Sequence, residues 1–192
     1  MFAFDGASLG DMDQVTWACE LAGRLLAEPL PRRWAHSQGV AARAESIAYV
    51  FGDDAGTLIA AAWLHDIGYA PTVADTGFHP LDGARYLREL GADPRICSLV
   101  AHHSCAAIEA RNRGLADVLE AEFEPVGGVL SDALTFCDMT TTPDGKPTEV
   151  EDRLAEILSR YGDGHLVAES IREASPCIVD AAVKVTELIE AR

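Results

Sequence analysis

Apolar residues recur at helical spacing along nearly the whole chain. No segment shows the strict alternation of apolar and polar residues, bounded by hairpin turns, that is typical of a half-buried β-strand. The pattern therefore predicts an all-α protein. The limits of its helices follow from the residues that favour helix ends, which are Asp and Pro at the start and Gly at the end.

The first 103 residues are predicted to form five helices. The third is apolar on every side, which is typical of a helix in the centre of a core. The fourth and fifth begin with Pro80 and Pro94, and Asp93 precedes the fifth as its N-cap. The expected limits are Asp11 or Asp13 to the break at 29–31, about 32–50, 55–68, 80–90 and 94–103.

The rest of the chain is also predicted to be helical. An apolar helix ends at Asp138, and Thr148 with Glu151 resembles a capping box that opens the next helix. Two further helices, separated at Ser175-Pro176, are expected to follow because proline disrupts a helix interior. Long loops, which often border functional sites, are expected at residues 72–79 and 139–148.

Composition fits a single globular domain over residues 1–192. Apolar residues make up 48% and charged residues 24% of the chain, which is close to the average of soluble proteins. The formal charge of -16 at pH 7 would repel the backbone of DNA or RNA. We therefore expect no polymeric nucleic acid as a partner. A small phosphorylated ligand is compatible with this charge, because bound metal ions reverse the local field.

The sequence further predicts a cytosolic protein with reduced cysteines and no membrane partner. Its start has no basic region followed by an apolar run, and no stretch approaches the roughly 20 apolar residues that cross a bilayer. The five cysteines are odd in number and form no CxxC pair, which argues against zinc-finger and redox motifs. We interpret them as small core residues in a reducing compartment: Cys19, Cys97, Cys105, Cys137 and Cys177.

Histidines are concentrated at the predicted ends of core helices. The chain has six of them, and all but His165, to which we assign no role, lie in the first 103 residues. Imidazole and carboxylate ligands together suit transition metals, and several helix ends that meet in one cavity can surround an ion. The candidate metal ligands are His36, His65, Asp66, His79, His102 and/or His103, and Asp138.

Adjacent residues of this set have different expected directions. The side chains of His65 and Asp66 diverge by about 100 degrees on a helix, so that Asp66 with its two oxygens can reach between two ions. His102 and His103 diverge in the same way. One of them is expected to bind metal while the other contacts substrate phosphate or a second ion, and the sequence does not decide which.

These residues resemble the HD superfamily of metal-dependent phosphohydrolases, which is named after its His-Asp pair. The resemblance lies in the order His36, His65-Asp66 and Asp138, in the contexts RWAHSQGVA, AAWLHDIGY and TFCDMT. It covers about residues 36–138, within a core of residues 32–140, and leaves a C-terminal helical extension outside.

The other histidines resemble the additional ligands of dinuclear members of this superfamily. His79 in HPLDGARYL and His102-His103 in LVAHHS are similar to those of HD-GYP phosphodiesterases and symmetrical dinucleoside tetraphosphate hydrolases. The GYP element is absent, and the segment after Asp138 reads MTTTPDGKP, so neither substrate is carried over. The resemblance implies a compact helical bundle with one or two divalent ions, of Fe, Mn, Zn, Ni or Co.

The expected activity is hydrolysis of a small phosphoester, such as a nucleotide or a related phosphate. Asp66 would bridge two ions, with His36, His65 and Asp138 on one and His79 with His102 or His103 on the other. If a single ion binds, the second group of histidines would bind phosphate or act as general acid. Asp66, His102 and His103 are thus the expected catalytic residues.

Weaker candidates and alternatives complete the prediction. Arg85 and Thr140 are possible substrate contacts, although an exposed ion pair and an ordinary turn are the plainer interpretations. Glu120, Glu122 and Glu124 are expected on a solvated helix surface. The same metal ligands would also serve a di-iron oxygenase of the HD type, or a ligand-sensing domain without turnover.

Overall fold

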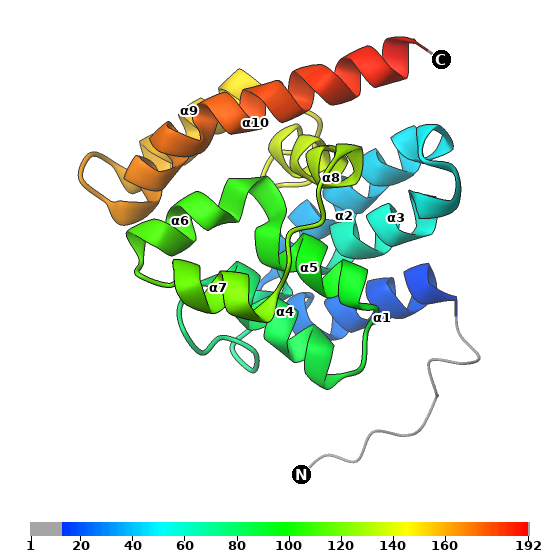
Figure 1. Ribbon diagram of the computed structural model, residues 1–192, viewed down its shortest axis with the longest axis horizontal. Helices are drawn as coiled ribbons and strands as arrows, with labels where there is room; N and C mark the ends of the chain where they lie inside the picture. The colour runs from blue at the N-terminus through cyan, green and yellow to red at the C-terminus, as the bar shows by residue number, and fades with distance from the viewer. Residues whose placement is uncertain (1–12, 192) are drawn as a thin grey trace.

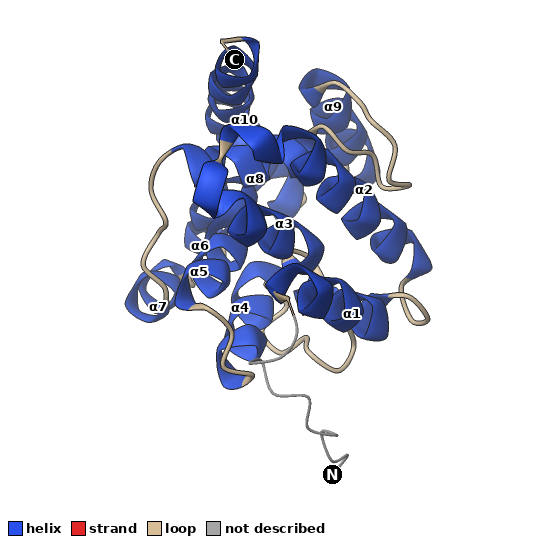
Figure 2. Ribbon diagram, turned by 90° about the vertical axis from the view of Figure 1, so that its right-hand side faces the viewer, coloured by secondary structure: helices blue, strands red, loops and turns tan. Residues whose placement is uncertain are grey.

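The computed structural model describes residues 13–191, and within this range every regular element is helical (Figure 2). Extended pairing is limited there to one isolated bridge, between Thr141 and Pro147. The all-α prediction is confirmed. The helices are α1 (Gln14–Leu26), α2 (Pro31–Ile47), α3 (Ala55–Leu64), α4 (His79–Glu89), α5 (Pro94–His102), α6 (Ala106–Asn112), α7 (Ala116–Glu122), α8 (Val129–Met139), α9 (Val150–Tyr161) and α10 (Leu166–Glu190).

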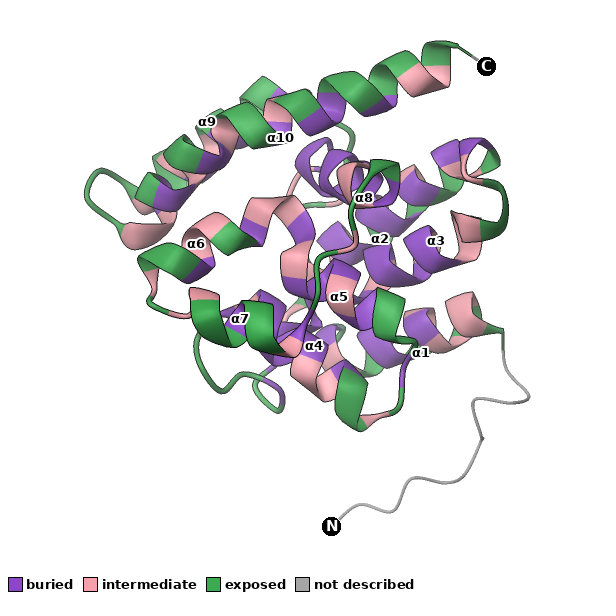
Figure 3. Ribbon diagram, in the orientation of Figure 1, coloured by how far each residue is buried: buried purple, intermediate pink, exposed green. Residues whose placement is uncertain are grey.

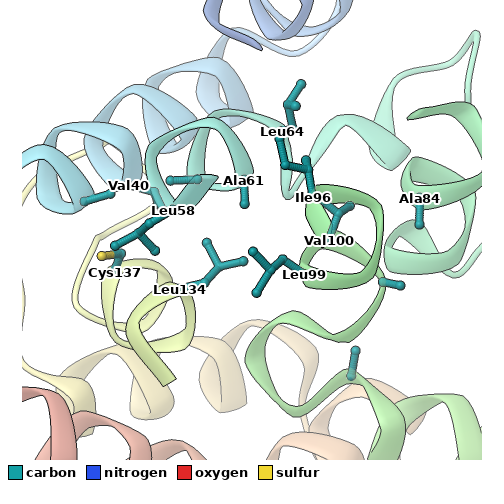
Figure 4. Close-up of a cluster of buried hydrophobic side chains, with 14 of the residues drawn as sticks. Val40, Leu58, Ala61, Leu64, Ala84, Ile96, Leu99, Val100, Leu134 and Cys137 are labelled. Atoms are coloured by element: carbon teal, nitrogen blue, oxygen red, sulfur yellow. The ribbon is translucent and has the colours of Figure 1, made fainter. Parts of the chain in front are cut away.

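Helix α3 forms the centre of the core. It packs against α1, α2, α5 and α8 (Figure 1), and its apolar sequence explains why it can be surrounded on all sides. Figure 4 shows Leu58 and Leu64 of α3 among side chains from these neighbours, including Leu99 of α5 and Leu134 of α8. Burial of this shared apolar surface is the main force that holds the helices together.

Helix α10 lies on the side of the molecule opposite α1 (Figure 1). It packs on α8, α9 and α6 (Figure 1), and it exposes its outer face while its inner face is buried (Figure 3). None of the helices within residues 13–191 has the length and apolar character needed to cross a membrane.

Several predicted helix ends are confirmed by their caps. The carboxylate of Asp13 accepts a hydrogen bond from the Thr16 amide at the start of α1, and Asp93 accepts one from the Arg95 amide at the start of α5. The alternative start of α1, Asp11, lies outside the described residues. Such caps satisfy amides that the first turn of a helix leaves without a partner.

Two predictions about the C-terminal part are wrong. Glu149 is the N-cap of α9 and no side chain caps this helix, so Thr148 and Glu151 form no capping box. In addition, α10 continues through Pro176 as one helix. The missing hydrogen bond at a proline costs about 3 kcal/mol, and burial of Ala174 and Ile178 on either side of it offsets that cost.

The interpretation of all five cysteines as reduced is also wrong. Cys105, just before α6, forms a disulfide with Cys177 of α10. The tertiary fold brings these two residues together across 72 positions of sequence, which no local pattern reveals. Among the free cysteines Cys97 and Cys137 are buried, as expected for core residues.

Two close backbone contacts position the segments that carry the site. A Cβ atom on Gly68 would lie 2.0 Å from the carbonyl oxygen of His79, so the turn after α3 can approach α4 only with glycine there. Gly145, with φ of +75°, lies against the Ala35 carbonyl of α2 in the same way. These contacts hold the turn after α3 against α4, and the predicted loop at 139–148 against α2.

Candidate metal centre

Five helices deliver imidazole and carboxylate groups to one place near the centre of the molecule. His36 lies within α2, His65 and Asp66 directly follow α3, His79 is the first residue of α4, His103 directly follows α5, and Asp138 lies in the last turn of α8. All of these side chains are buried apart from His79, whose side chain is 16% exposed.

The six side chains form two groups of three. In each group, one potential ligand atom per residue lies within 4.8 Å of the others. This separation leaves room for an ion between them, because metal–ligand bonds of about 2.0 to 2.2 Å place ligand atoms on opposite sides of a cation. The first group is His36, His65 and Asp138, and the second is Asp66, His79 and His103.

Backbone carbonyls orient three of the imidazoles in the same way. The Nδ1 atom of His65 lies 2.8 Å from the Ala62 carbonyl oxygen, and that of His103 lies 2.7 Å from Val100 O. Nδ1 of His36 lies 3.0 Å from the Thr142 carbonyl oxygen. When Nδ1 donates its proton to these carbonyls, the lone pair of each Nε2 faces the centre, which is the arrangement typical of metal-ligating histidines.

Two of these Nε2 atoms lie close to carboxylate oxygens. Nε2 of His36 lies 2.9 Å from Oδ1 of Asp138, and Nε2 of His65 lies 3.3 Å from Oδ2 of Asp66. Nε2 of His65 is fully buried and has no hydrogen-bond partner among residues 13–191. A lone pair beside a carboxylate oxygen is repulsive unless a proton or a metal ion lies between them, so the donor set fits divalent cations.

Asp66 lies between the two groups. Its Oδ2 faces His65, and its Oδ1 lies 3.4 Å from Nε2 of His79. The helix ends at Leu64, and the backbone turn that follows lets Asp66 point toward the same centre as His65. Asp66 therefore presents one oxygen to a histidine of each group. Oδ2 also accepts a hydrogen bond of 2.7 Å from the guanidinium of Arg33.

Asp138 is held by a strained turn. The hydroxyl of Ser104 donates a hydrogen bond to its Oδ2. Ser104 and Cys105 have positive φ angles of 51° and 58°, a conformation that L-residues seldom adopt. The turn that follows His103 is thus shaped so that its hydroxyl reaches the carboxylate.

Aromatic stacking fixes the most exposed ligand. The ring of Tyr69 stacks on that of His79 with 4.0 Å between ring centroids, and the guanidinium of Arg33 lies over Tyr69 at the same distance. Nε2 of His79 lies 3.2 Å from Nε2 of His103. The stack therefore holds His79 at the mouth of the second group.

The two groups differ in the pKa values of their imidazoles. Burial alone would lower the pKa of His65, but the carboxylates of Asp66 and Asp138 outweigh burial and raise this pKa to about 9. The pKa of Asp138 is held below its usual range by His36 and His65 in spite of burial. Burial lowers the pKa of both His79 and His103, so that these two imidazoles are neutral near pH 7.

Three predicted site residues lie elsewhere. Nε2 of His102 lies 2.7 Å from the Phe123 carbonyl oxygen, so this imidazole turns away from the centre and His103 is the residue that joins it. Arg85 forms an ion pair with Glu122, and the hydroxyl of Thr140 donates to the Phe136 carbonyl. None of these three belongs to either group of ligands.

Two acidic residues have structural roles that the sequence analysis did not assign. Asp82, buried in α4, accepts hydrogen bonds from the amides of Asp75 and Thr76 and thereby holds the loop before His79. Glu122 binds both Arg85 and Arg88. It is therefore an anchor between α7 and α4, where a solvated surface residue was expected.

Three residues of the site were not predicted from the sequence: Arg33, Tyr69 and Ser104. The first two stand in the very contexts that carry the resemblance, RWAHSQGVA and AAWLHDIGY. Arg33 precedes His36 by three positions, which places both on one face of α2. Ser104 ends the context LVAHHS, but its role depends on a left-handed turn that the sequence did not predict.

A pocket opens above the ligands. Its floor contains Asp66, His79, His103 and Asp138, and α9 and α10 form the opposite wall. That wall combines apolar side chains with two arginines: Arg153, Ile157, Arg160 and Tyr161 from α9, and Val167, Ile171 and Ala174 from α10. The ligand groups are thus accessible to a small molecule from one side.

A helical bundle with these paired His and Asp ligands defines a protein of the HD class. The family model of the HD domain matches residues 33–161, and the chain belongs to this family. The match extends through α9, which the sequence analysis had placed outside the resemblance. The family is part of a superfamily of metal-dependent phosphohydrolases. Neither the curated proteins nor the solved structures contain a significant match to the chain.

Proposed function

We propose that this protein is a phosphohydrolase that uses two divalent cations to hydrolyse a small phosphoester or phosphoanhydride. The observation that carries this proposal is the pair of His and Asp groups, which meet at Asp66 and in which three imidazoles have Nδ1 at a backbone carbonyl and Nε2 turned toward the centre. Membership of the HD family supports the same reaction class.

The ligands divide between two ions. His36, His65 and Asp138 would hold one ion, His79 and His103 the other, and Asp66 both. Bound cations of this kind supply Lewis-acid activation of a phosphoryl group and lower the pKa of water. The ligand set suits Fe, Mn, Zn, Ni or Co and leaves the choice among them open.

The second group suits a cation better than general-acid catalysis. A general acid must carry a proton at neutral pH, whereas burial lowers the pKa of both His79 and His103. The two Nε2 atoms lie only 3.2 Å apart, so a single cation between them could bind both when each imidazole carries its proton on Nδ1. This favours two ions over a single ion with histidine acid.

Arg33 would position the substrate. Burial alone would lower the pKa of its guanidinium, but the neighbouring Asp66 carboxylate raises it, so Arg33 is a permanent cation. It lines the pocket beside Asp66, where a guanidinium can form a bidentate contact with phosphoryl oxygens. The charge of -16 continues to argue against polymeric nucleic acid as substrate.

The proposal is tested by metal analysis and activity together. Protein purified without chelators should contain up to two transition-metal ions per chain and release phosphate from members of a nucleotide and phosphoester panel. Asp66→Ala should lose both metal and activity. Asp180→Ala, which removes an exposed carboxylate from α10, is the matched control and should lose neither.

Two results would reject the mechanism. One is undiminished turnover by metal-free Asp66→Ala protein. The other is an iron-loaded wild-type protein that consumes dioxygen and releases no phosphate, which would establish the oxygenase alternative in its place.

A further inference from the structure

A second hollow lies next to the pocket above the metal centre, and the same three arginines line both. This second hollow, of about 310 Å³, is lined by residues 29–31 and by Pro143, and His36 alone among the six ligands borders it. The two hollows have three residues in common, and all of them are arginines: Arg33, Arg153 and Arg160.

This concentration of positive charge is unusual for the chain. The protein contains 15 lysines and arginines against 31 acidic residues, yet three arginines meet at this boundary. Glu156 is shared between Arg153 and Arg160, and Arg33 pairs with the metal-centre residue Asp66. The acidic side chain of Glu109, which lines the first pocket, is already neutralised by Arg113. The boundary therefore keeps an excess of positive charge.

Arg153 has a hydrogen-bond donor without a partner. Its side chain is 5% exposed, and its Nε atom has no acceptor among the described residues. An unpaired buried guanidinium donor is costly, because the group has lost its water without gaining a partner. Since Arg153 lines both hollows, a small rotation of its side chain would bring this guanidinium donor to an anion in either one.

We propose that Arg153 and Arg160, together with Arg33, form a second anion-binding subsite that takes a second phosphate group of the substrate. This inference rests on the proposed function. The scissile phosphate must lie at the ligand groups, whereas the second hollow lacks Asp66, His79, His103 and Asp138. A phosphate bound there is therefore a different group of the same molecule. A guanidinium fork binds carboxylate and phosphate alike, but a phosphate group carries about -1.5 to -2 charge and three acceptor oxygens, which two neighbouring arginines can contact together.

The test uses phosphonates, whose phosphorus–carbon bonds resist phosphoester hydrolysis. Three series with chains of two to four carbons are compared. Alkylphosphonates carry one phosphonate, phosphonocarboxylates carry a phosphonate and a carboxylate, and bisphosphonates carry two phosphonates. Their binding to Mn²⁺-loaded protein is measured by calorimetry, and the metal content is measured before and after. The best bisphosphonate should bind at least about tenfold more tightly than the alkylphosphonate of equal length.

Variants test whether the arginines cause the tighter binding of the bisphosphonate, which is called its advantage below. Arg160→Gln should remove most of it while changing the affinity for the alkylphosphonate by less than about threefold. Arg153→Lys keeps the charge but removes Nε, and should reduce the advantage as well. Arg172→Gln removes an exposed arginine of α10 outside both hollows and should leave the advantage intact. Circular dichroism checks the fold, and Arg153→Lys decides the outcome if Arg160→Gln does not fold.

The subsite is refuted if no bisphosphonate binds better than its alkylphosphonate, or if the advantage survives in both arginine variants. Equal binding of phosphonocarboxylates would refute the assignment to phosphate. The proposed hydrolase function can be rejected independently of the subsite. Arginine-dependent bisphosphonate binding by a protein that hydrolyses no phosphoester would retain the subsite and reject the hydrolase.

Discussion

At the scale of single residues, the adjacent histidines His102 and His103 have different roles. His102 ends α5 with its Nε2 at the Phe123 carbonyl, whereas His103 leaves the helix and joins the metal ligands. The difference arises from the backbone, because His102 leaves helical geometry with φ of -115° and ψ of 7°, which turns the next residue, His103, out of the helical path. Their chemistry is identical, so only geometry separates a ligand from a structural residue.

Alanine substitution of these two histidines should therefore give different results. His103→Ala removes a ligand and should lower metal affinity at least about tenfold, with a matching loss of activity. His102→Ala should retain both. Equilibrium dialysis against a metal buffer gives the affinities, and equal losses in the two variants would contradict the assignment of His103.

At the scale of elements, the site depends on how closely α4 approaches the turn after α3. Gly68 makes this approach possible, and the stack of Tyr69 on His79 follows from it. On the outer side, Glu122 of α7 holds Arg85 and Arg88 of α4. Helix α4 is thus fixed from two directions, which keeps His79 at the second ligand group.

Gly68→Ala should disturb this packing. The added Cβ would meet the His79 carbonyl at 2.0 Å, so α4 must shift and the free energy of unfolding should fall by about 1 to 3 kcal/mol. Metal affinity should fall with it. The control is Gly56→Ala in α3, where nothing lies within 4 Å and alanine should stabilise by about 0.5 to 1 kcal/mol. Urea unfolding measures both, and equal effects would contradict the contact.

The ion pairs of Glu122 predict a pH dependence. Hydrogen bonds from Arg85 and Arg88 lower the pKa of Glu122 to about 2. A carboxylate with a lowered pKa in the folded state stabilises it fully above the unfolded value of about 4.5, and this contribution is lost as the pH falls toward 2.

Glu122→Gln should therefore reduce the free energy of unfolding at pH 7 by about 1 kcal/mol, the scale of a partly exposed ion pair. The difference from the wild type should shrink as the pH is lowered below 4.5. Chemical unfolding at several pH values tests this expectation. A difference that stays constant between pH 7 and pH 3 would show that the carboxylate charge is not responsible.

At the scale of the whole molecule, α10 and α9 close the pocket over the metal centre. The disulfide between Cys105 and Cys177 ties α10 to the turn that carries Ser104. One wall of the pocket and one support of Asp138 are consequently linked by a covalent bond across the fold.

Removal of this bond should destabilise the protein. Closing a loop of 72 residues restricts the unfolded chain by about 4 kcal/mol in the chain-entropy estimate. Cys177→Ser should lower the free energy of unfolding by up to that amount, and a reducing agent should have little further effect on it. Cys19→Ser, at a free cysteine, is the control. An equal response of wild type and Cys177→Ser to reduction would contradict the disulfide.

The sequence by itself determined the helical class, most helix limits and nearly all residues of the two His and Asp groups. Apolar spacing and caps act within a few residues, and the order of His36, His65-Asp66 and Asp138 is readable without a fold. Only the tertiary structure decided that His103 and not His102 faces the centre, that Cys105 meets Cys177, and that Arg153 joins Arg33. The physical reason is that these outcomes depend on contacts between distant segments, whose geometry is set by packing and leaves no local pattern.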